Sequence, residues 1–176
     1  MCQCYSIMYN DNLNQQDYYI CQLMKSAEKE FIGPIPEEYK LAILGDLASQ
    51  AIAEDNLEDL EVFLRYGADV NVCMEWGYKG QGGYLLDLAV EKGNEKIIKI
   101  LLDHKADPEK SVIQAVAYGY IEGLKALLKY VENAANVYVY DEDECEYKGS
   151  VLGLARKKGN EEIIKLLLEH NASEEE

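Results

Sequence analysis

The chain has 176 residues, enough for one compact domain, and 48% of them are apolar, which excludes an intrinsically disordered polymer. It carries 17 Lys and Arg against 33 Asp and Glu, a formal net charge of −16. A field of this sign repels phosphate backbones and anionic lipid headgroups. Direct nucleic-acid or membrane binding is therefore not expected, and a basic protein partner is favoured.

The cysteines and the apolar runs indicate a cytoplasmic protein. The five cysteines are an odd number and are scattered along the chain, which is a poor disulfide framework and favours free thiols in a reduced compartment. They stand at Cys2, Cys4, Cys21, Cys73 and Cys145. We find no pattern of a signal peptide and no apolar run near the ~18 residues of a membrane span.

Residues 1–45 are expected to form an N-terminal segment and a helical cap, with residues 1 to about 12 loose. Five apolar side chains share one face of a predicted helix, namely Ile20, Leu23, Met24, Ala27 and Phe31. Gly33-Pro34 ends that helix, and Pro36-Glu37-Glu38 has the composition of a new helix start. The predicted role of these helices is to cover the open apolar face of the first repeat.

Sequence repeats follow the cap. The segment 93–104 recurs as 159–170, and looser copies lie at 55–66 and 119–130. Each copy is followed by a short turn, and the first residues of these turns are Gly67, Lys105, Val131 and Asn171. Their spacings of 38, 26 and 40 residues indicate insertion and deletion at one tolerant loop of a repeat of about 33 residues.

Each repeat is predicted to be a helix, a tight turn and a longer helix. In the second copy, residues 85–90 form a short apolar helix, and Gly93-Asn94 turns the chain. One face of the longer helix that follows is apolar, with Ile97, Ile98, Leu101 and Leu102. A single pair of this kind cannot bury its own apolar face, so neighbouring pairs must stack into a continuous core.

These motifs resemble the ankyrin-repeat family. Gly67-Ala68-Asp69-Val70-Asn71 matches the family's closing element residue for residue, and 84–90 and 150–156 keep the Leu and Ala positions of its opening element without Thr-Pro. A tetratricopeptide array lacks the Gly-Ala-Asp turn. The resemblance implies an all-α solenoid of about four repeats, forming one domain with the cap. The repeats are expected at approximately 46–71, 84–109, 110–133 and 150–173 of a domain segment 46–176.

The connections between repeats vary in length. Compared with the family pattern, 70–83 is about five residues longer, 134–149 about seven longer and 107–110 about seven shorter, so the third repeat is expected to lack a projecting hairpin. Val137-Tyr138-Val139-Tyr140 alternates like a strand, which suits a hairpin arm. By resemblance, the hairpins and the first helices line a concave surface on which partners dock.

Aromatic and acidic residues gather in the long connections, and we predict that they bind the partner. Tyr and Trp are enriched at binding hot spots because they bury much area with few rotatable bonds. The predicted partner-binding residues are Trp76, Tyr78, Tyr84, Tyr118, Tyr138, Tyr140, Asp141, Glu142, Asp143, Glu144 and Tyr147. The alternative is that these rings pack back onto the stack and hold the long connections in place.

No catalytic, cofactor or metal site is expected. His104 and His170 occupy the same place in their repeats, which indicates a structural position rather than a dyad. Cys2 and Cys4 lack the second ligand pair that zinc requires. Residues 77–83 are glycine-rich without the Gly-Lys-Ser/Thr order of a phosphate loop, and 141–146 lack the glycine of a Ca²⁺ loop.

The sequence therefore favours a non-enzymatic module that binds a basic protein partner. Narrower alternatives are an immunity-type inhibitor of a toxin or nuclease, and a bacterial or viral effector delivered into a host cell. The contrasting class is an enzyme that uses Cys73, Cys145 or the carboxylates of 141–146.

Overall fold

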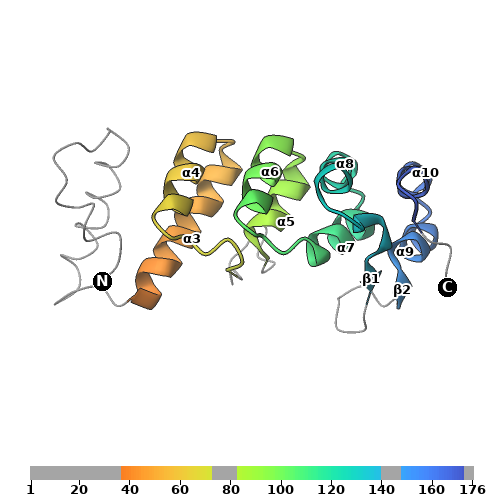
Figure 1. Ribbon diagram of the computed structural model, residues 1–176, viewed down its shortest axis with the longest axis horizontal. Coiled ribbons are helices and arrows are strands. Elements are labelled where there is room, and N and C mark those ends of the chain that lie inside the picture. Colours follow the sequence, from red (N-terminus) through yellow and green to blue (C-terminus); the bar gives the residue numbers. More distant parts are fainter. Residues whose placement is uncertain (1–36, 73–82, 140–147, 173–176) are drawn as a thin grey trace.

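The computed structural model describes residues 37–72, 83–139 and 148–172, with side chains from residue 40 onward. Within these ranges the chain forms four successive pairs of helices (Figure 1). The pairs are α3 (Glu37–Ala53) with α4 (Leu57–Arg65), α5 (Leu85–Lys92) with α6 (Glu95–Asp103), α7 (Glu109–Tyr118) with α8 (Ile121–Tyr130), and α9 (Val151–Lys158) with α10 (Glu161–Glu169). The expected all-α solenoid is confirmed.

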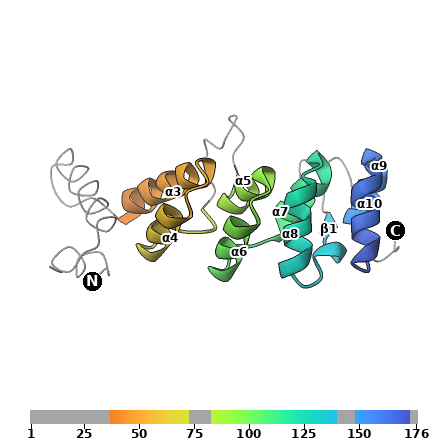
Figure 2. The ribbon, with the colours of Figure 1, turned by 90° about the horizontal axis from the view of Figure 1, so that it is seen from above.

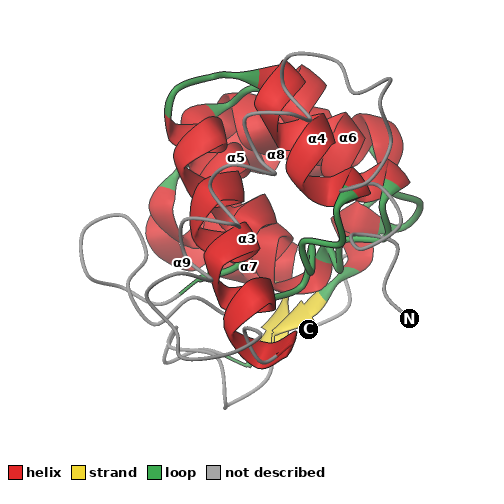
Figure 3. Cartoon of the chain, turned by 90° about the vertical axis from the view of Figure 1, so that its left-hand side faces the viewer, coloured by secondary structure: helices red, strands yellow, loops and turns green. Residues whose placement is uncertain are grey.

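The helices form two layers. The first helices, α3, α5, α7 and α9, each pack on the next to form one row, and the second helices, α4, α6, α8 and α10, form the other (Figure 2). Figure 3, a view along the array, shows the helix layers together with the strands at one edge. The predicted helix start at Pro36-Glu37-Glu38 is confirmed, since α3 begins at Glu37. The same helix continues to Ala53, so the expected boundary between residues 45 and 46 falls inside it.

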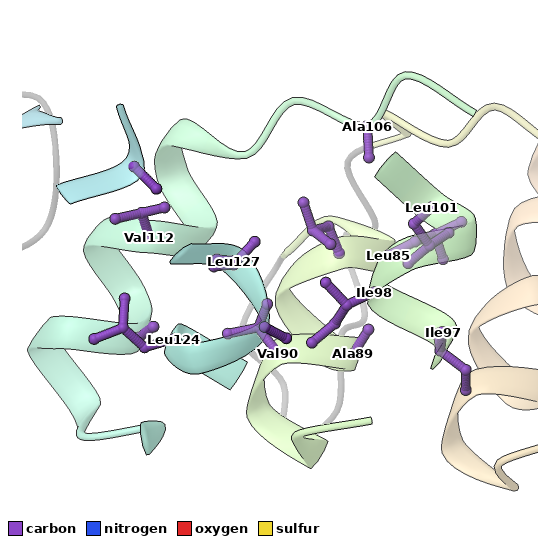
Figure 4. Packing of buried hydrophobic residues seen from close by; sticks show 14 of the residues in the cluster. Leu85, Ala89, Val90, Ile97, Ile98, Leu101, Ala106, Val112, Leu124 and Leu127 are labelled. Carbon is purple, nitrogen blue, oxygen red and sulfur yellow. The ribbon is translucent and has the colours of Figure 1, made fainter. Parts of the chain in front are cut away.

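The core is continuous through the stack. Leu85, Ile97, Leu101, Leu124 and Leu127 are fully buried. In Figure 4, Val90 of α5 lies between Ala89 and Ile98 on one side and Leu124 and Leu127 of α8 on the other. Each pair therefore completes the core of its neighbour, as a solenoid requires.

Two sets of left-handed residues make the turns. Within the pairs, Asp55, Gly93, Gly119 and Gly159 have φ between 56° and 81°. After the pairs, the left-handed residues are Gly67, Lys105, Asn133 and Asn171. The left-handed residue of the third turn, Asn133, is the last residue of the expected turn Val131-Glu132-Asn133, so this set is spaced 38, 28 and 38 residues apart, whereas the first residues of the expected turns are spaced 38, 26 and 40. The reason is that α8 is a residue longer than α6 and α10, and its C-cap Val131 is extended.

The connections differ as the sequence predicts. Residues 104–108, between α6 and α7, contain no strand. Between α8 and α9, β1 (Tyr138–Val139) pairs antiparallel with β2 (Gly149–Ser150) after the short 3-10 helix η2 (Ala134–Asn136). Val139 is buried and Tyr138 faces outward, which confirms the alternation predicted there.

Asparagine side chains tie neighbouring repeats together. Asn71 donates to the carbonyl of Lys105 at 3.1 Å and accepts from the amide of Asp107 at 2.8 Å. Asn136 donates to the carbonyl of Asn171 at 3.4 Å. In both cases the acceptor is the left-handed residue of the next turn, so the same contact joins repeats 1 and 2 and repeats 3 and 4.

Candidate functional site

Three of the predicted partner-binding residues lie in the described ranges: Tyr84, Tyr118 and Tyr138. The others lie outside the described residues, namely Trp76, Tyr78, Tyr140, Asp141, Glu142, Asp143, Glu144 and Tyr147. The described part of the candidate site therefore consists of these three tyrosines and the residues around them.

Tyr84 and Tyr138 lie at the starting ends of first helices. Tyr84 is the N-cap residue of α5 and is half-buried. The Lys110 ammonium lies 5.4 Å from the centroid of its ring, a cation–π contact. Tyr138 lies in the strand pair that leads into α9 and is 49% exposed. Tyr84 thus contacts a lysine of the next repeat and is half-buried, whereas about half of the Tyr138 side chain is exposed.

Tyr118 lies at the opposite end of a first helix, where the helix finishes. It is the last residue of α7 and is 54% exposed. A helix of the length of α7 spans about 15 Å, so the structure does not bring Tyr118 together with the tyrosines at the starting ends. The predicted surface is therefore divided between the two ends of the first helices.

Tyr120 is a neighbour of Tyr118 that the sequence interpretation did not single out. The two rings flank Gly119, whose left-handed backbone (φ 81°) reverses the chain and brings their centroids to 5.9 Å. Burial raises the pKa of the Tyr120 hydroxyl, and the charge of Glu91 and the Tyr118 ring raise it further. Glu91 thus lies close enough to this ring to act on it electrostatically. The sequence does contain a sign of this pair. In the other three repeats an Asn follows the left-handed residue of the turn, whereas here Tyr120 follows Gly119.

A buried carboxylate links repeats 2 and 3. Asp87 of α5 is only 7% exposed and accepts hydrogen bonds from the Ser111 hydroxyl and the Tyr84 amide, the second at 2.9 Å. The Gln114 amide lies 3.4 Å away and Lys110 is nearby. Burial raises the pKa of Asp87 despite these partners. Because both oxygens are used by groups of the fold, the arrangement holds α5 to α7.

The histidines share one structural environment. Nδ1 of His104 lies 2.9 Å from the carbonyl of Ile100, and Nδ1 of His170 lies 2.9 Å from the carbonyl of Leu166. Both side chains are exposed at the ends of second helices. This equivalence agrees with the structural interpretation of the two residues.

Within the described ranges, no group of three or more His, Cys, Asp or Glu side chains is arranged to hold a metal ion. All five cysteines, the glycine-rich segment 77–82 and the acids of 141–146 lie outside those ranges. In the part of the chain that the structure places, no helix combines the length and apolar character needed to cross a bilayer.

The comparison with known families agrees with this geometry. A family model of ankyrin repeats in three copies matches residues 48–141, just over half of the chain. The chain belongs to the ankyrin-repeat family. Members of this family are in general modules for protein–protein interaction and are typically not enzymes. No curated protein matches the chain.

Proposed function

We propose that the protein binds a basic protein partner through the face of its first helices and through the two enlarged connections, 70–83 and 134–149. The observation that carries the proposal is the exposure of Tyr118 and Tyr138. Among the large apolar side chains of the described residues they are the most exposed, at 54% and 49%, and both belong to first helices or the strands leading into them. Exposed aromatic side chains on a rigid scaffold are typical of binding hot spots.

The charge supports a basic partner. At a net charge of −16 the protein attracts cationic surfaces over a distance of about 10 Å at 0.1 M salt and repels anionic ones. The acids at 141–144 are proposed to contribute to this attraction together with Trp76, Tyr78, Tyr84, Tyr140 and Tyr147. A narrower form of the proposal is an inhibitor that covers the basic site of a toxin or nuclease, or an effector that acts on a host protein in the cytoplasm.

Affinity capture from the source cell, at low and moderate salt and followed by mass spectrometry, tests the proposal. The variants are Tyr118→Ala with Tyr138→Ala, Trp76→Ala, and neutralisation of Asp141 to Glu144. The control is Leu168→Ala, because Leu168 is an exposed apolar residue (43%) on a second helix.

We expect a basic protein to be captured by the wild type and by the Leu168 variant, and at least tenfold less by the combined tyrosine variant. That loss corresponds to about 1.4 kcal/mol, within the range of a hot-spot residue. Equal capture by the wild type and all variants would contradict a partner surface on this face.

A further inference from the structure

The junction between repeats 2 and 3 departs from the regular stacking. In Figure 1, α4 and α6 are seen from the side whereas α8 and α10 are seen nearly end-on, so the second helices change direction there. Helix α8 packs on both α6 and α5, and more extensively on α6 than α4 does. At the far end of α8, the Lys129 ammonium and the Tyr130 hydroxyl both lie 2.7 Å from Oε1 of Glu95 in α6.

A glycine permits this close approach. Gly123 is the third residue of α8, where α6 and α10 have Ile97 and Ile163. A Cβ atom on Gly123 would lie 2.2 Å from the carbonyl oxygen of Val90, far inside contact distance. The third repeat has therefore replaced a core side chain with a backbone contact that draws α8 against the end of α5.

The same repeat lacks the usual helix cap. Asn56, Asn94 and Asn160 precede α4, α6 and α10, and each side chain accepts a hydrogen bond from an amide in the first turn. Tyr120 holds this position before α8 and makes no such bond. Replacing an N-cap Asn forgoes a hydrogen bond that stabilises the start of the helix. Local rules broken in this way are expected at functional or strained sites.

A groove lies at this junction. We define the junction groove by its lining, which comes from the end of α5, from the α7–α8 turn and from α10: Val90, Glu91, Lys92, Gly93, Gly119, Tyr120, Ile121, Glu122, Gly123 and Glu162. Its volume is about 440 Å³. The three acids face two lysines: Lys92, whose ammonium donates to the carbonyl of Ala53 at 2.7 Å, and Lys125, which contacts Glu122 and Glu162. The acids outnumber the lysines by one, so the groove is negative, and the Tyr120 ring forms part of its wall.

The groove already attracts a lysine of the protein itself. The Lys125 ammonium lies 2.7 Å from Glu122 and 3.8 Å from Glu162, and the hydrogen bond of Glu122 raises its pKa. This pair occupies the α10 side of the groove. Elsewhere in its wall the groove is lined by Glu91 and Tyr120, and the exposed Tyr118 ring lies 5.9 Å from the Tyr120 ring.

We propose that the junction groove receives a Lys or Arg side chain of the protein partner. The cationic head lies near the Glu91 carboxylate and over the faces of the Tyr118 and Tyr120 rings, which attract cations within about 6 Å. The apolar stem of the side chain lies along the groove toward Ile121. The proposal rests on the proposed function and narrows it, because it assigns the basic character of the partner to one recognised side chain.

A defined probe tests the site without knowledge of the partner. The probe is a fluorescein-labelled peptide of alternating Gly and Arg, with a Gly–Glu peptide of equal length as the reference ligand. Binding to the full chain is measured by fluorescence anisotropy, and the position of the probe by amide chemical shifts. The variants are Tyr118→Ala, Tyr120→Asn and Glu91→Gln.

The controls separate this site from the general field of an acidic protein. Glu61→Gln on the exposed face of α4 changes the net charge as Glu91→Gln does, and Leu168→Ala removes an exposed apolar side chain from a second helix outside the groove. Tyr120→Asn restores the cap found in the other repeats, so we expect its thermal stability to be equal to or above that of the wild type.

We expect the Arg peptide to shift the amides of Gly93, Gly119 and Gly123 and to bind about threefold more weakly to each of the three variants. That factor is the loss of one exposed cation–π contact in the tyrosine variants and of one exposed ion pair in Glu91→Gln. The two controls should bind within the error of the wild type. Equal weakening by Glu91→Gln and Glu61→Gln, or unchanged binding after both tyrosine substitutions, would overturn the junction site.

The two proposals can fail separately. Capture of a basic partner that is insensitive to Tyr120→Asn and Glu91→Gln would reject the junction site and leave the proposed function standing. Peptide binding at the groove without capture of any partner in the cell would reject the proposed function.

Discussion

At the scale of single residues, Asp87 shows how one side chain serves both its own helix and the next repeat. It accepts from the Tyr84 amide at the start of α5 and from the Ser111 hydroxyl of α7. Burial raises its pKa above the ordinary value of 3.8, since loss of hydration outweighs these hydrogen bonds and the charge of Lys110. Asp87 therefore joins α5 to α7 by hydrogen bonds, while the burial of its charged form is unfavourable.

This residue predicts a pH dependence. Below pH 3.8 the carboxyl is protonated in the folded and unfolded chain alike, so its burial carries no charge penalty. Above the raised folded pKa the unfolded chain gains from ionisation, and the folded state loses stability. We expect the stability of the wild type relative to Asp87→Asn, measured by urea denaturation, to increase as the pH falls from 7 toward 4.

The exposed Glu61 provides the comparison for that experiment. The stability difference between the wild type and Glu61→Gln should change little over the same pH range, because the Glu61 side chain is exposed and loses little hydration on folding. A difference between the wild type and Asp87→Asn that stays constant, or that decreases on acidification, would show that burial does not control this group.

At the scale of the elements, the second helices are defined by their ends. A left-handed residue ends each first helix, and in three repeats an Asn then begins the second helix. Asn94 is the most fully used, since it accepts from the amides of Lys96 and Ile97 at 3.1 and 3.3 Å and donates to Asp55 in the preceding repeat at 3.0 Å. One side chain thus caps a helix and joins two repeats.

The cap predicts a measurable loss. Asn94→Ala should lower the free energy of unfolding by about 1 kcal/mol, because two amides at the start of α6 lose their acceptor. Asn94→Ser keeps a hydroxyl acceptor and should lose less than half of that amount. Equal losses for Ala and Ser in thermal or urea denaturation would mean that the cap contributes little.

At the scale of the whole molecule, the array is a row of pairs whose stability comes from each pair and from the interfaces between neighbours. The interface between repeats 2 and 3 combines the contact of Gly123 with Val90, the Asp87 hydrogen bonds and the Glu95 contacts with Lys129 and Tyr130. The Glu95 contacts are exposed, so the buried contacts are expected to contribute most.

The junction predicts a loss of coupling. In Gly123→Ala the new Cβ would displace α8 from α5 and should lower the stability by about 1–3 kcal/mol, a typical cost of overpacking. Native-state hydrogen exchange should then give different opening free energies for α6 and α8, which we expect to be similar in the wild type.

Gly67→Ala is the matched control for this measurement. Gly67 has a left-handed backbone (φ 96°) but a Cβ there would meet no atom within 4 Å, so the substitution strains a turn outside the junction. It should lower the stability without separating the exchange of α6 from that of α8. If the opening free energies of α6 and α8 differed in Gly67→Ala, or stayed similar in Gly123→Ala, the role assigned to the junction between repeats 2 and 3 would be contradicted.

The candidate site was only partly predictable from the sequence. Tyr118 could be identified because it comes just before a turn, and Tyr138 because it belongs to a segment that alternates like a strand. Both side chains are exposed in the structure. Tyr84 was predicted on the same grounds, yet its ring is half-buried and contacts Lys110 from the next repeat. Tyr120 was missed because Glu91, which belongs to the preceding repeat, comes to line the same groove only through the stacking of repeats 2 and 3.

The sequence by itself determined the repeat architecture, since apolar spacing, capping residues and left-handed turn residues act within a few positions of one another. It was sufficient for the helix pairs, the start of α3, the missing hairpin after α6 and the strand at Tyr138–Val139. Only the tertiary structure decided the close approach of α8 to α5, the burial of Asp87 and the groove beside Tyr120. These features depend on contacts between residues about 24 to 35 positions apart, which local pattern does not encode.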